Sequence, residues 1–216
     1  MNGLNINGMK FFLFVFVVFF FSSCGVQISL KSSDVGAEFN LSIDIGNAFL
    51  ETISGALGIE NGSVFALFDT EELRSVLSEA DFYDVSVQFE SERKMRISGK
   101  FDWNSNNPLV LSKIVNTLQN RAALLIFSAE NLQTLYALLP RDFKNYLDMF
   151  MAPSFTGEEM NDDEYMDLLA SVYGDGLVEE LKSAMITVTM LNGGAQPTEK
   201  NIPLLKILNI SGELRM

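Results

Sequence analysis

The chain has 216 residues, of which 28 are acidic and 15 basic, so its formal net charge at pH 7 is −13. Such a balance repels phosphate backbones and anionic headgroups, which argues against a nucleic-acid partner and against direct docking on acidic lipids. Histidine is absent from the sequence, which excludes Ser-His-Asp and Cys-His catalytic arrangements and histidine-based metal sites.

The first 24 residues have the pattern of an export signal. Lys10 is the only charged residue in this stretch, and an apolar run from Phe11 to Phe21 follows it. The run is too short to cross a bilayer as a helix, which needs about 20 apolar residues. Two serines then lead to Cys24, the only cysteine of the chain. The pattern predicts a secretory signal peptide over residues 1–23.

Residues 21–25, Phe-Ser-Ser-Cys-Gly, resemble the lipobox of bacterial lipoproteins, and their looser form is similar to that of spirochaete lipoproteins. The resemblance implies that residues 1–23 are removed and that Cys24 is acylated, with palmitate as an expected acyl group. It also implies that the protein is anchored in the cell membrane or outer membrane, on the periplasmic side or at the cell surface. The alternative is a chance cysteine just past an ordinary secretory cleavage site.

Residues 24–36 are mixed and partly polar, and they predict a tether between the lipid and a single domain over 37–216. Fully extended, such a tether would reach about 40 Å. Apolar residues then alternate over 37–45, which predicts a half-buried strand. A helix is expected over 47–57, because apolar residues share one face there and Gly58 follows.

A second helix is expected after Asp69, because Glu72 lies three residues on, as in a capping box. The segment 83–103 predicts a β-hairpin: apolar and polar residues alternate on both sides of a charged turn at 92–94. The solvent-facing side chains are acidic on the first strand of this hairpin and largely basic on the second. Opposite charges on neighbouring strands favour antiparallel pairing.

The pattern from about residue 105 to 184 is mainly helical, with helices expected on both sides of Pro140. Leu124–Phe127 fits either a buried helix end or a short strand. An acidic helix, whose apolar stripe runs from Tyr165 to Val172, is expected to end at Gly174. A central strand is expected over 185–191 and a last, half-exposed strand over 208–215, with Pro203 just ahead of it.

This order of elements predicts an α+β domain with a mostly antiparallel sheet of four to six strands and a helical layer on one face. The densest group of acids, over 158–167, has two interpretations. It is either a solvated helix start, where acids cap free N–H groups, or a Ca²⁺ site, although its spacing is not that of an EF-hand. No metal, cofactor or catalytic residue is predicted.

A cluster of phenylalanine and methionine suggests one candidate ligand site, an apolar pocket next to the helix break at Pro153. Its predicted lining residues are Phe143, Met149, Phe150, Met151 and Phe155. Ordinary core packing is the competing interpretation. The sequence therefore favours a non-enzymatic binding or scaffold domain at a membrane surface, and it leaves both a protein partner and an apolar ligand open. Its alternatives are a carrier or sensor of a lipid-like ligand and, last, a carboxylate-based hydrolase.

Overall fold

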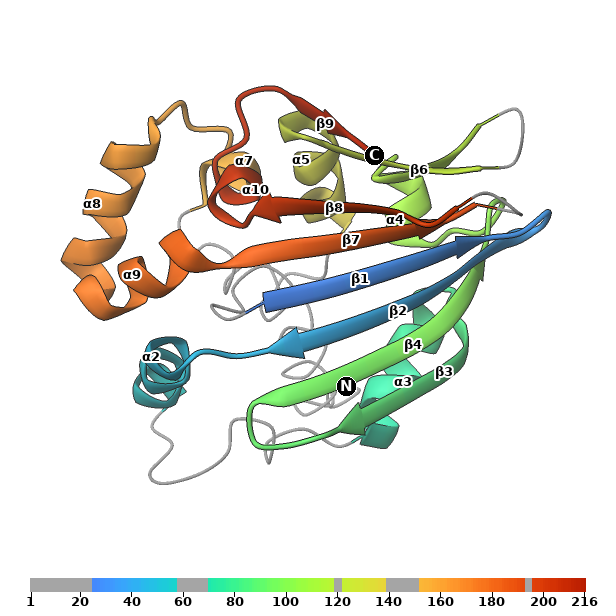
Figure 1. Cartoon of the computed structure of the whole chain (residues 1–216), viewed down its shortest axis with the longest axis horizontal. Helices are drawn as coiled ribbons and strands as arrows, with labels where there is room; N and C mark the ends of the chain where they lie inside the picture. Colours follow the sequence, from blue (N-terminus) through green and yellow to red (C-terminus); the bar gives the residue numbers. More distant parts are fainter. Residues whose placement is uncertain (1–24, 58–69, 119–121, 139–151, 193–195) are drawn as a thin grey trace, which may run out of the picture.

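The computed structural model describes residues 25–57, 70–118, 122–138, 152–192 and 196–216 (Figure 1). Two sheets are present in these residues, a six-stranded one in the order β3-β4-β2-β1-β7-β8 and a three-stranded one in the order β5-β6-β9. The strands of the large sheet are β1 (Gly25–Ser32), β2 (Gly36–Asp44), β3 (Tyr83–Phe89), β4 (Lys94–Asp102), β7 (Met185–Leu191) and β8 (Thr198–Pro203). Those of the small sheet are β5 (Val115–Thr117), β6 (Ala123–Ser128) and β9 (Glu213–Arg215).

The helices of the described residues lie between these strands along the chain. They are α2 (Asn47–Leu57), α3 (Thr70–Glu79), α4 (Pro108–Leu111), α5 (Ala129–Leu138), α7 (Pro153–Thr156), α8 (Asp162–Tyr173), α9 (Asp175–Ser183) and α10 (Leu205–Leu208). All neighbouring strands of the large sheet run antiparallel except β1 and β7, which are parallel. The predicted α+β class, with a mostly antiparallel sheet of up to six strands, is confirmed.

The predicted tether is wrong, because residues 25–32 form β1, a central strand of the sheet. β1 is hydrogen-bonded to β2 on one side and to β7 on the other. Val26, Ile28 and Leu30 are buried, and polar residues alternate with them. This is the period of a half-buried strand, and it holds here because both edges of the segment find a partner. The folded domain therefore includes Gly25 and does not begin at residue 37.

The turn between β1 and β2 requires glycine at position 36. Ser33 Oγ donates to the Gly36 carbonyl at 3.0 Å, and the Gly36 amide donates back to Ser33 Oγ at 3.2 Å. A Cβ atom at residue 36 would lie 2.0 Å from the Phe101 carbonyl oxygen on β4. The close approach of these two backbones allows β2 to pair along its whole length with β4.

The predicted strand at 37–45, helix at 47–57 and hairpin at 83–103 are confirmed as β2, α2 and β3–β4. Leu124–Phe127 belongs to a strand, β6. Asp69 and the helix expected after Pro140 lie outside the described residues. In α8, which was predicted, Tyr165 and Leu169 are buried but Val172 is 52% exposed, so the expected stripe is shorter than its pattern.

The prediction for the C-terminal segment is wrong in its first half. Leu208 ends the helix α10, and β9 covers only Glu213–Arg215. Leu204, Ile207 and Leu208 are buried together, and their spacing is that of one helix face. Pro203 ends the edge strand β8, where its missing N–H is tolerated.

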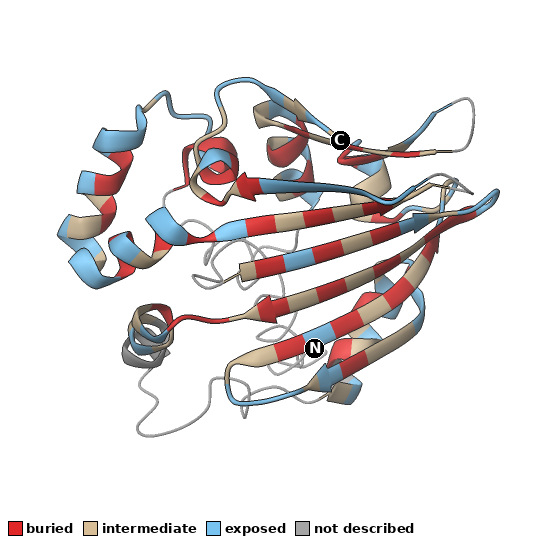
Figure 2. Ribbon diagram, viewed as in Figure 1, coloured by how far each residue is buried: buried red, intermediate tan, exposed pale blue. Residues whose placement is uncertain are grey.

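One hydrophobic core lies on a single side of the large sheet. Figure 1 looks onto the sheet with α3 behind β3 and β4, and the buried residues of α3 join the same core. Phe82 connects the layers: its ring centroid lies 4.9 Å from that of Phe39 and 5.8 Å from that of Phe101. The alternation of buried and more exposed residues along β1, β2, β4 and β7 is visible in Figure 2.

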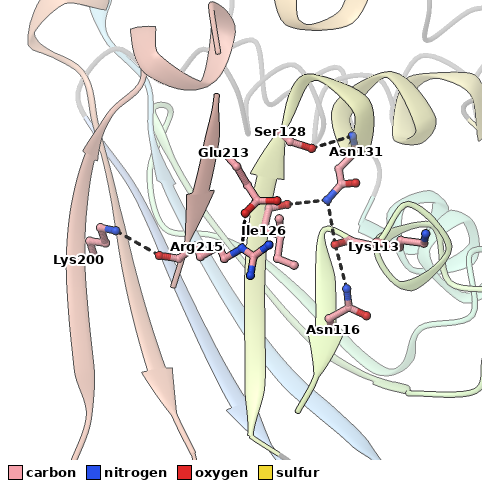
Figure 3. A network of polar contacts seen from close by, with 8 residues as sticks. All are labelled: Lys113, Asn116, Ile126, Ser128, Asn131, Lys200, Glu213 and Arg215. Atoms are coloured by element: carbon pink, nitrogen blue, oxygen red, sulfur yellow. Dashed lines mark hydrogen bonds and ion pairs between the residues drawn. The ribbon is translucent and has the colours of Figure 1, made fainter. Parts of the chain in front are cut away.

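A network of polar contacts joins the small sheet to α4 and α5 (Figure 3). Lys113 has a left-handed backbone, with φ of 60°. Its carbonyl accepts hydrogen bonds from the side-chain amides of Asn131 at 3.2 Å and of Asn116 at 3.4 Å. Asn131 also donates to the Ile126 carbonyl of β6 at 3.2 Å, so one buried amide fixes both the turn and the strand.

Candidate functional site

The predicted apolar pocket has one residue in the described part of the chain, Phe155. Its side chain is 4% exposed and belongs to the core, with its ring centroid 6.2 Å from that of Tyr136. The neighbouring Ser154 Oγ donates to the Ile207 carbonyl at 2.7 Å and accepts from the Ile210 amide at 2.8 Å. These bonds connect α7 to α10 and the residues that follow it.

The other four residues proposed for that pocket, Phe143, Met149, Phe150 and Met151, lie outside the described residues. The pocket itself stays a prediction.

The acids of the segment 158–167 lie before and within the first turns of α8. Asn161 is the N-cap: its side chain accepts from the Glu164 amide at 3.0 Å, and Glu164 Oε2 accepts from the Asn161 amide at 3.1 Å. Asp162 Oδ1 accepts from Asn209 Nδ2 at 2.8 Å. In the described residues, no group of three or more acidic or cysteine side chains is placed to hold a metal ion. The segment has the geometry of a capped helix start.

A different surface stands out, the side of the large sheet that faces away from the core. We call it the open face. Pairing is in register across six strands, so its side chains form straight rows. One row is Gln88, Arg96, Ser42, Gln27, Thr187 and Asn201. The next is Ser86, Ser98, Asn40, Ser29, Thr189 and Glu199.

These two central rows contain polar residues only. Ten of their twelve residues are Ser, Thr, Asn or Gln, and the other two, Arg96 and Glu199, are charged. An antiparallel sheet often has one solvated face, so the exposure alone is ordinary.

Most of these side chains make no hydrogen bond to another protein group in the described residues. In the central rows, Thr187 Oγ1 donates to Asn201 Oδ1 at 2.7 Å, and Arg96 pairs with Glu90 at 2.8 Å. Eight others make no hydrogen bond or ion pair with their side chains in the part of the chain that the structure describes: Gln27, Ser29, Asn40, Ser42, Ser86, Gln88, Ser98 and Thr189.

Charges gather in the flanking rows, where the two signs neutralise each other. Lys100, Glu38 and Lys31 follow one another across three strands, and Lys94 is opposite Asp44 at the other end. Lys94 also pairs with Glu90 at 3.0 Å, and this contact lowers the pKa of the Glu90 carboxyl, with a smaller effect from Arg96. The Lys100 ammonium lies 2.7 Å from Asp84, which raises the pKa of Lys100.

Sequence reasoning did not single out the open face. Alternation marks which residues of each strand are polar, but the rows exist only because strands far apart in sequence pair in one register. Cys24 lies outside the described residues, immediately before Gly25 at the start of β1. No helix in the described residues is long and apolar enough to span a membrane.

Comparisons with known proteins found no match to a family model, to a curated protein or to a solved structure. Function is therefore inferred from this chain's own residues.

Proposed function

We propose that this chain is a bacterial envelope lipoprotein whose domain, anchored through Cys24, works as a binding or scaffold module at a membrane surface. The lipobox-like residues 21–25 support the anchor. A chain without histidine lacks the commonest general acid–base and metal-ligating side chain, which supports binding over catalysis.

The observation that carries the proposal is the position of β1. Its first residue, Gly25, is opposite Asp44 of β2 and follows Cys24 directly. One extended residue spans at most about 3.6 Å, so a lipid on Cys24 would be joined to the middle of the sheet without a spacer. The end of the sheet at which β1, β4 and β7 begin would then lie against the headgroups, and the strands would rise from the membrane.

Direct attachment gives the domain a defined orientation. A flexible tether would let the domain rotate freely, whereas a lipid next to a central strand keeps one end of the sheet at the membrane. Two acyl chains provide stable anchoring, while one chain binds only marginally. The open face would then stand beside the membrane, accessible to components of the envelope.

The test is metabolic labelling with a fatty acid analogue in a bacterial host. Cys24→Ala should abolish labelling and release the protein from the membrane fraction. Ser23→Ala is the matched control, because it replaces a neighbouring residue with one that is common at that lipobox position, and it should keep full labelling. Equal labelling of Cys24→Ala and the unchanged chain would refute the anchor.

A further inference from the structure

We draw no further inference here: the strongest candidate, the open face of the large sheet with its two polar rows, carries none because nothing in the described residues shows what covers it.

Discussion

Glu180 of α9 caps the first turn of α2 by accepting a hydrogen bond from the backbone amide of Phe49 at 3.0 Å. The same carboxylate accepts from the Ala48 amide at 2.8 Å. The first turn of α2 contains no acidic residue of its own, so its free N–H groups are satisfied by a side chain 131 positions further along the chain. This bond ties α2 to α9.

Replacing Glu180 by Ala should destabilise the protein by about 1–2 kcal/mol, because two amides lose a charged acceptor at a helix N-terminus. Urea unfolding followed by circular dichroism measures the loss. Glu179→Ala is the matched control: Glu179 is exposed and pairs only with Lys182 among described groups, so its removal should cost less than about 0.5 kcal/mol. Equal losses for the two variants would show that the cap contributes nothing.

Tyr165 makes the free energy of unfolding depend on pH in the alkaline range. Burial raises the pKa of its hydroxyl well above the ordinary range, with a smaller effect from Tyr173. The unfolded chain ionises this group at about pH 10, while the folded chain keeps it neutral. The folded pKa is the higher one, so the stabilisation is complete below about pH 10 and falls as the pH rises further.

Tyr165→Phe should therefore flatten the fall in stability above about pH 10, as measured by urea unfolding at pH 8 to 11. Tyr83→Phe is the comparison. The pKa of Tyr83 is raised by its hydrogen bond to Asp102, but its ring is exposed, so most of the slope should persist in that variant. A Tyr165→Phe protein with the unchanged slope would refute the assignment.

Asn131 supports the strained turn at Lys113 (Figure 3). Asn131→Ala would leave the carbonyls of Lys113 and Ile126 without their shared donor and should cost about 1–3 kcal/mol. Asn116→Ala removes only the longer, exposed bond to Lys113 and should cost under about 0.5 kcal/mol. Thermal unfolding of the two variants gives the comparison, and a larger loss for Asn116→Ala would contradict this arrangement.

Direct attachment of the anchor predicts which end of β1 meets the membrane. Met185 lies at the start of β7, beside the start of β1, whereas Val35 lies in the turn after β1 ends. A fluorophore on Met185→Cys should be quenched by a quencher placed on lipid headgroups, and one on Val35→Cys, about 26 Å further along an eight-residue strand, should not. Equal quenching at both positions would indicate a freely turning domain.

The sequence was most informative where local patterns agree with tertiary structure. The alternation in β2 and β4 and the acidic start of α8 depend on neighbouring residues, and the sequence indicates each of them. β1 has the same alternation, but its place directly after Cys24 favoured a tether. Whether such a short segment becomes a central strand depends on β2 and β7, which lie on either side of it only after folding.

The open face was beyond sequence reasoning for a similar reason. Ser42 and Thr187 both lie beside Gln27, although they come from strands far apart in the chain. No local pattern encodes that meeting, because the register is set by the long-range pairing of six strands. The spacing of Leu204, Ile207 and Leu208, by contrast, does indicate the helix α10 and was available in the sequence.

The central claim is that Cys24 is lipidated and begins the mature protein, with the sheet starting one residue later. Mass spectrometry of the tryptic N-terminal peptide from the membrane fraction tests it most directly. The expected peptide runs from Cys24 to Lys31 and carries acyl groups on its first residue. An unmodified cysteine, or a mature N-terminus at any other residue, would contradict the claim.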